Sequence, residues 1–84
     1  MKKRKLLQKL LSSPKNVRFS EATFCAEMFG FQLSRIKGSH HIYTHNEVRE
    51  LVNLQDVNGW AKPYQIKQLL SIIEKYNLKM EDEV

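Results

Sequence analysis

The fold of this 84-residue chain is decided by residues 30–45, which read GFQLSRIKGSHHIYTH. From Phe31 onward, apolar and polar side chains alternate with a period of two, as in Phe31 and Leu33, and this pattern is typical of half-buried strands. Residues 37–39 contain a glycine and predict a turn. Residues 40–45 then predict a second strand, which must pair antiparallel with the first because the connection is short.

Successive side chains of a strand point to opposite faces of its sheet. Residues 40–45 therefore place His40, Ile42 and Thr44 on one face and His41, Tyr43 and His45 on the other. Tyr43 has the largest apolar area to bury, so we expect its face to pack against helices. This assignment leaves His40 on an open face of the sheet.

Outside this stretch, the pattern predicts one more strand and three helices. Residues 46–49 predict a turn, residues 50–54 a third strand, and residues 55–62 a loop that contains Asn58-Gly59. A helix then begins at Pro63, and its apolar side chains recur at helical spacing as Ile66, Leu69, Leu70 and Ile73.

The region before residue 30 predicts two helices. Residues 2–11 carry leucines at helical spacing, at positions 6, 7, 10 and 11. For the second helix we expect Ser20 as the N-cap, with Phe19 and Phe24 spaced as a hydrophobic staple. Gly30 is expected just after its C-terminus.

The element order is therefore α-α-β-β-β-α, and the predicted fold class is an α+β two-layer sandwich with helices on one face of a three-stranded antiparallel sheet. The length fits a single domain, residues 1–84. Within it we distinguish an additional N-terminal helix and loop (1–17), a core (18–78) and an acidic tail (79–84).

The charge balance favours an anionic partner. Fourteen Lys and Arg residues against nine Asp and Glu residues give a formal net charge of +5, and residues 6–80 alone remain at +4. Nucleic acid is the first candidate for such a surface. No apolar run approaches the roughly 20 residues that a membrane helix needs, so we expect a cytoplasmic protein without a membrane partner. The single cysteine, Cys25, can form neither an internal disulfide nor a cysteine zinc site.

Several catalytic chemistries find no support in the residue pattern. His41 and His45 share a face but lie about 13 Å apart along a strand, too far to hold one ion, and His40 points to the other face. Cys25 lies on the apolar face of a helix, where a buried thiol is expected. The carboxylates Glu47, Glu50 and Asp56 are scattered. We expect neither a metal nor a small-molecule cofactor.

The remaining candidate is His40 beside cations. Arg35 and Lys37 lead into the Gly38 turn, where the backbone can come close to a ligand. Cations with exposed backbone N–H groups favour phosphate, and imidazole is the usual proton carrier near neutral pH. Lys62 and Lys67 flank the start of the last helix, which also favours phosphate. The alternative is that His40 is a surface histidine without a role.

These residues also carry a family resemblance. Gly38-Ser39-His40, preceded by a basic strand and followed by Tyr43, resembles the motif of the HicA family of bacterial toxins. Residues 52–55 and 62–68 resemble longer members, and the resemblance covers about residues 20–76. It implies a double-stranded-RNA-binding-like fold, a metal-independent endoribonuclease that cleaves mRNA (an mRNA interferase), and a HicB-type antitoxin as protein partner. The family's catalytic histidine corresponds to His40. Residues 1–17, the first helix and the loop after it, are additional.

The sequence therefore predicts an RNA-cleaving toxin in which His40 is the general acid or base, the two roles being left open. We expect the RNA phosphates to be bound by Arg35, Lys37, Gly38, Ser39, Lys62 and Lys67. One alternative is a non-catalytic RNA-binding or protein-interaction module of the same fold. Another is a structural interaction domain whose first helix, which carries Leu6 and Leu10, docks to a partner.

Overall fold

The computed structural model describes residues 3–80 and confirms the α+β fold class and the order α-α-β-β-β-α. Position 2, the expected start of the first helix, and positions 81–84 of the expected acidic tail lie outside the described residues. The elements are α1 Lys3–Ser12, the 3-10 helix η1 Pro14–Asn16, α2 Phe19–Met28, β1 Gln32–Lys37, β2 His40–His45, β3 Val48–Gln55 and α3 Pro63–Lys75. The strands form one antiparallel sheet in the order β1-β2-β3.

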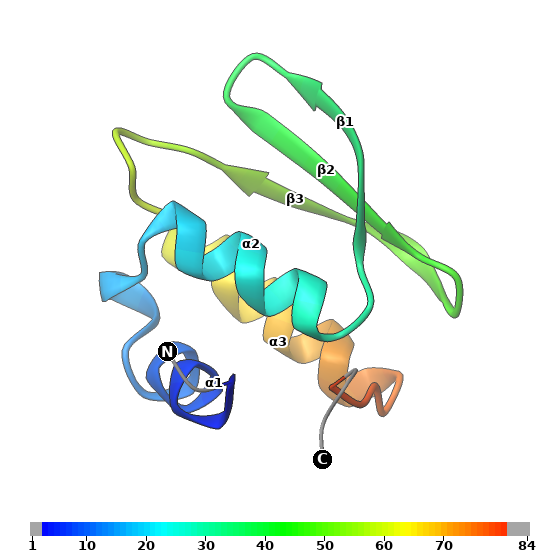
Figure 1. Cartoon of the computed structure of the whole chain (residues 1–84). Helices are drawn as coiled ribbons and strands as arrows, with labels where there is room; N and C mark the ends of the chain where they lie inside the picture. The colour runs from blue at the N-terminus through cyan, green and yellow to red at the C-terminus, as the bar shows by residue number, and fades with distance from the viewer. Residues whose placement is uncertain (1–2, 81–84) are drawn as a thin grey trace.

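The helices lie on one side of the sheet (Figure 1). α2 and α3 pack against β3, whereas α1 packs on α2 and α3 and so adds a layer beyond them. Leu6 and Leu10 of α1 are fully buried in this packing. These two leucines are therefore not available to a separate partner, because this chain's own helices already cover them. Docking of α1 through its other residues stays a prediction.

The apolar core lies between the sheet and the helices and fixes the two faces of β2. Tyr43 is only 2% exposed, as its large apolar area predicts. Val52 and Leu54 of β3 and Ile66 and Leu69 of α3 are buried in the same core. Since Tyr43 points inward, His40 stands on the opposite face of the sheet, which the helices do not cover.

The start of α2 differs from the expectation. The helix begins at Phe19 with Arg18 at the N-cap, so Ser20 is inside the helix and is not the cap. Phe24 is 41% exposed and does not close a hydrophobic staple into the core. Glu21 explains the shift: its carboxylate accepts the backbone N–H of Arg18 at 2.9 Å, which favours a start one turn before Glu21.

The end of α2 follows the sequence signal. Gly30 has φ +90°, a conformation that side chains other than glycine rarely adopt. Its N–H donates to the carbonyl of Glu27, and the N–H of Phe31 donates to the carbonyl of Ala26. This pair of bonds is a Schellman motif, and it buries Phe31 just before β1. The expectation that Phe31 belongs to the strand is therefore wrong by one residue.

The sheet register contains an irregularity that the alternation did not predict. Leu33 pairs with Tyr43, but Arg35 pairs with Ile42, so Ser34 is an extra residue in β1. Such a β-bulge reverses the alternation of the residues that follow it. The turn between β2 and β3 is also shorter than expected, since β3 begins at Val48.

In the part of the chain that the structure describes, no helix is both long and apolar enough to cross a bilayer.

An ion pair ties the additional helix α1 to the core. Lys9 Nζ contacts both carboxylate oxygens of Glu21, at 2.8 and 2.9 Å. Burial by itself would raise the pKa of Glu21, but the hydrogen bonds from Lys9 and from the Arg18 N–H outweigh it and lower the pKa below 4.5. The ionised carboxylate therefore stabilises the folded state above that pH.

We expect the Glu21→Gln variant to be less stable than the parent at neutral pH, by about 0.2–1 kcal/mol. The amide oxygen of Gln can still accept the Arg18 N–H, but the variant lacks the negative charge that pairs with Lys9. Because the folded pKa of Glu21 is depressed, this difference should shrink as pH falls through that pKa, and it should vanish when Glu21 is protonated. Urea unfolding from pH 7 to pH 3 measures it. Glu74→Gln, at an exposed position in α3, is the control. A difference that is independent of pH would contradict the assignment.

Candidate functional site

His40 is the first residue of β2 and lies in the middle strand of the sheet. Lys37 of β1 is opposite it on one side, and Gln55 of β3 is opposite it on the other. Residues directly opposite in an antiparallel sheet point to the same face, with Cβ atoms about 4.5–5.5 Å apart. The structure thus places Lys37, His40 and Gln55 in one row across the open face.

A second row follows along the strands, made by Arg35, Ile42 and Asn53. Arg35 reaches this face because of the bulge at Ser34. With regular alternation from the inward-facing Leu33, the side chains of Arg35 and Lys37 would point toward the helices. The bulge moves both cations to the face of His40, where both are exposed. The structure therefore brings Arg35, Lys37 and His40 together as the sequence predicts, by a feature the sequence did not reveal.

A side-chain contact orients the imidazole of His40. Its Nδ1 lies 3.1 Å from Oδ1 of Asn53, and the ring is half-buried. An amide oxygen can only accept a hydrogen bond, so Nδ1 carries the proton in this contact. In the neutral ring, Nε2 then holds the free lone pair. This arrangement presents the ring as a proton acceptor on the open face.

Hydrogen bonds that involve β3 and α3 fix the turn beside His40. The carbonyl of Ser39 accepts the N–H of Asp56 at 2.9 Å, and Ser39 Oγ accepts a bond from Gln55 Nε2 at 3.2 Å. The N–H of Gln55 in turn donates to Oε1 of the buried Gln65 at 2.7 Å. These bonds connect α3 through β3 to the β1–β2 turn, so the position of Ser39 and His40 depends on α3.

Gly38 leaves the tip of this turn open. It has φ +61°, and an added Cβ would meet no atom within 4 Å. Glycine is therefore needed here for its backbone conformation and not for lack of space. The residues on either side of it, Lys37 and Ser39, are also exposed.

The other two cations that the sequence singled out belong to α3 and its N-cap, not to the sheet. Lys62 is the N-cap of α3, and its ammonium lies 5.9 Å from the ring of Tyr64. Lys67 lines an apolar groove of about 370 Å³ between α1 and α3, together with Leu7, Leu11 and Leu70. The structure thus separates Lys67 from His40.

The remaining histidines lie on the helix-facing side. The ring of His41 packs edge-on against Phe19 with centroids 4.7 Å apart, and its Nδ1 is buried without a hydrogen-bond partner among residues 3–80. His45 packs against Phe31. In the described part of the chain, His, Cys, Asp and Glu side chains form no group of three or more that could hold a metal ion.

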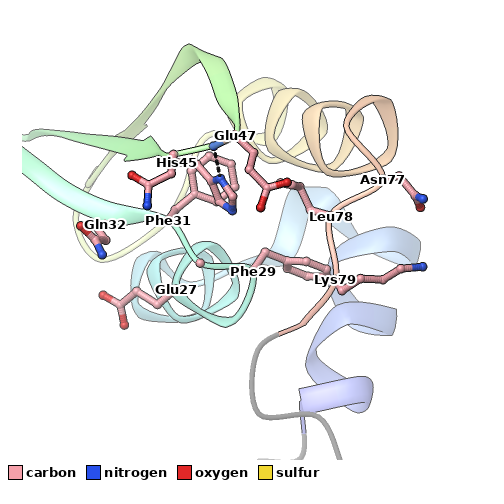
Figure 2. Close-up of a pocket in the computed structure, with 11 residues that line it drawn as sticks. Glu27, Phe29, Phe31, Gln32, His45, Glu47, Asn77, Leu78 and Lys79 are labelled. Carbon is pink, nitrogen blue, oxygen red and sulfur yellow. Dashed lines mark hydrogen bonds between the residues drawn. The ribbon is translucent and has the colours of Figure 1, made fainter.

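A polar pocket of about 330 Å³ lies at the other end of β2 (Figure 2). Its lining includes His45, Glu47 and Glu27, and His45 Nδ1 accepts the N–H of Glu47 at 3.0 Å. Phe29 and Phe31 also line it, and Figure 2 shows Phe31 beside His45. The hydrogen bond and the aromatic contact explain His45 as a residue that fixes the β2–β3 turn.

The cysteine has no accessible nucleophilic form. Cys25 is fully buried in α2, and this burial raises the pKa of its thiol to about 12. A reactive cysteine needs a lowered pKa and access to solvent. Cys25 therefore contributes to the core, as its position on the apolar helix face predicts.

Sequence reasoning missed the residues that support His40. Asn53 and Gln55 share a face of β3 with each other and with His40, but this follows only when the register of β2 and β3 is known. The alternation within residues 50–54 does place Asn53 opposite to the buried Val52 and Leu54. That was the one available signal that Asn53 faces outward.

Comparisons with models of protein families, with curated proteins and with solved structures gave no match.

The two hydrogen-bonded histidines should occupy opposite tautomers. His40 donates from Nδ1 to Asn53, whereas His45 accepts at Nδ1 from a backbone N–H. We expect imidazole ¹⁵N chemical shifts, recorded well above the ordinary imidazole pKa of about 6.5, to show the proton on Nδ1 of His40 and on Nε2 of His45. Asn53→Ala should shift only the His40 signals toward a mixture of tautomers. A His40 that carries its proton on Nε2 in the parent chain would contradict this orientation.

Proposed function

We propose that this chain is an endoribonuclease that cleaves RNA, mRNA in particular, with His40 as the general base. The observation that carries the proposal is the His40–Asn53 pair on the open face of the sheet, with Lys37 directly opposite His40. An oriented imidazole beside exposed cations is suited to transferring a proton next to a phosphate. The resemblance to HicA toxins, carried by Gly38-Ser39-His40, agrees with this chemistry.

RNA supplies its own nucleophile, so the protein needs no metal-bound water for the first step. His40 Nε2 takes the proton of a ribose 2′-OH, and the 2′-oxygen attacks the adjacent phosphorus. The bond from phosphorus to the 5′-oxygen of the next nucleotide breaks, and that oxygen takes a proton from water. The products are a 2′,3′-cyclic phosphate and a free 5′-OH. A single well-placed base contributes about 10²–10⁴-fold to the rate.

Arg35 and Lys37 supply the positive charge that this reaction requires. Negative charge accumulates on the phosphate oxygens in the transition state, and a preorganised cation stabilises it more than it stabilises the substrate. Arg35 can bind two phosphate oxygens at once, whereas Lys37 acts as a point charge. The open space beside Gly38 gives the phosphate room to approach both side chains.

Asn53 is assigned the role of a positioning residue. It does not touch the phosphate in this mechanism, but its Oδ1 holds the proton on His40 Nδ1 and leaves Nε2 free. It also accepts from the imidazolium once the 2′-OH proton has been taken. A binding module without turnover, the main alternative, would explain the cations equally well, but it offers no reason for this histidine–amide pair.

Replacing His40 with Ala should reduce cleavage at least about 10²-fold, because it removes the base and leaves Arg35 and Lys37 in place. RNA binding should persist, and the melting temperature should change little for a residue outside the core. Cleavage of a labelled RNA by the purified full-length chain, in the presence of EDTA, measures the effect.

His41→Ala is the matched control, since it changes a neighbouring histidine on the opposite face. His41 packs on Phe19, so its loss should destabilise the protein by about 1 kcal/mol while cleavage is retained. Two results would refute the assignment of His40: a His40→Ala protein that cleaves at the parental rate, or a parent chain that binds RNA without cleaving it.

The proposal includes a protein partner that covers the open face, as the likeness to antitoxin-controlled toxins implies. This face combines the basic Arg35 and Lys37 with the exposed apolar side chain of Leu51. A partner with acidic groups around an apolar centre would complement it in charge and in surface chemistry.

We expect the partner to be an antitoxin of the HicB type that is encoded beside this chain. Mixed with this chain in equal amounts, it should abolish both RNA binding and RNA cleavage. Arg35→Glu should weaken the complex because it reverses a charge at the interface, whereas Lys67→Glu, on the groove beside α1, should not. Calorimetric titration of the partner into each variant provides the comparison. A complex that cleaves RNA at the full rate would show that the partner binds elsewhere.

A further inference from the structure

The turn that follows β3 carries a patch of exposed aromatic and basic side chains that the proposed reaction does not use. The Trp60 patch consists of Arg18, Val57, Trp60, Lys62 and Tyr64. Trp60 is the chain's single tryptophan and is 42% exposed, and Tyr64 is 61% exposed. Large aromatic side chains left in solvent on a small domain are a common mark of a binding surface.

The backbone holds Trp60 rigidly. Val57 and Trp60 exchange two hydrogen bonds, of 2.9 and 3.0 Å, around Asn58 and Gly59. Both central residues have positive φ, +53° and +89°, so this is a type I′ turn. On the other side, Gly59 O accepts the N–H of Phe19 and Val17 O accepts the N–H of Ala61. A ligand that contacts Trp60 therefore meets a surface that loses little conformational freedom on binding.

Positive charge lies directly on this surface. The guanidinium of Arg18 lies 4.5 Å from the centroid of the Trp60 ring, and Lys62 adjoins Tyr64. The nearby carboxylate of Asp56 accepts the N–H of Gly59 at 2.7 Å, within the turn. Trp60 remains substantially exposed even though Arg18 covers part of it. An exposed ring flanked by cations complements an unpaired base flanked by phosphates.

The Trp60 patch lies at the same end of the sheet as the His40 cluster. β3 runs from Gln55, the partner of His40, directly into the turn, and the N–H of Asp56 bonds to Ser39. Val57 is two residues beyond Gln55, or about 7 Å along an extended chain. Figure 1 shows the β1–β2 turn and the loop after β3 at the same end of the sheet. One RNA strand can therefore contact both places.

We propose that Trp60 is a stacking platform for one unpaired base of the RNA, with Arg18 and Lys62 binding its flanking phosphates. This inference rests on the proposed function for the identity of the ligand as RNA, and it adds that the RNA is single-stranded near the site. In a duplex the flat faces of the bases are covered by their neighbours, so a protruding tryptophan finds a base to stack on only where the strand is unpaired.

Because Trp60 is the single tryptophan, its fluorescence reports on this contact directly. The full-length chain with His40→Ala, which keeps the RNA intact, is titrated with oligoadenylate, with an abasic ribose–phosphate oligomer of the same length, and with duplex RNA, at constant salt. We expect oligoadenylate to quench the emission strongly. The abasic oligomer and the duplex should quench it little and bind more weakly.

Variants separate stacking from charge. Trp60→Ala should weaken oligoadenylate binding about 5- to 150-fold, as expected for one stacked base, and should leave binding of the abasic oligomer unchanged. Trp60→Phe should retain most of the affinity, and Phe24→Ala, at an exposed aromatic position on α2, should have no effect. These affinities are measured by polarisation of a labelled RNA, and each variant is first compared with the parent by circular dichroism.

The platform and the nuclease proposal can fail independently. If the parent chain cleaves RNA but oligoadenylate and its abasic counterpart bind equally well, or Trp60→Ala binds like the parent, the platform is refuted and the nuclease stands. If stacking is observed and no cleavage occurs, the stacking platform is supported, the nuclease proposal is refuted, and the chain is an RNA-binding module. Quenching by a protein partner alone, with none by RNA, would also refute the platform.

Discussion

The burial of Tyr43 is the constraint on which the arrangement of the open face depends. Side chains alternate along β2, so one inward-pointing residue determines the sheet face to which every other side chain of the strand points. With Tyr43 in the core, His41 and His45 must also point toward the helices, where they pack on Phe19 and Phe31. His40 is thereby left to solvent. A shift of one residue in this strand would bury the histidine that the proposed chemistry needs and expose the tyrosine.

Much of the architecture followed from local patterns, and the errors have physical causes. The element order, the two faces of β2 and the glycine that ends α2 could be predicted, because each depends on neighbours in sequence. The start of α2 was misplaced because Ser20 is a better intrinsic cap than Arg18, and the contact of Glu21 with the Arg18 N–H and Lys9 overrode that preference. Propensity is a weak guide where such contacts compete with it.

The candidate site was harder to predict because it is assembled across strands. His40, Arg35 and Lys37 could be predicted from one segment of sequence. Their position on a common face depends on the bulge at Ser34, and no residue in that segment predicts the bulge. Asn53 and Gln55 join the site only through the register of β3, which their own sequence does not set. Trp60 lies in a loop, where the sequence pattern carries no signal for its exposure. Its exposure is a tertiary property, set by how residues 17–19 pair with the turn.

The bulge at Ser34 also has a consequence for self-association. β1 is an edge strand, and all six of its residues are exposed, including Leu33 and Ile36. An exposed edge strand with apolar side chains invites pairing with the same strand of a second molecule. A bulge and charged side chains are two of the features that oppose such pairing, and β1 has both, the bulge at Ser34 and the like charges of Arg35 and Lys37. The same two cations that are proposed to hold RNA thus also oppose the growth of a small sheet into a larger one.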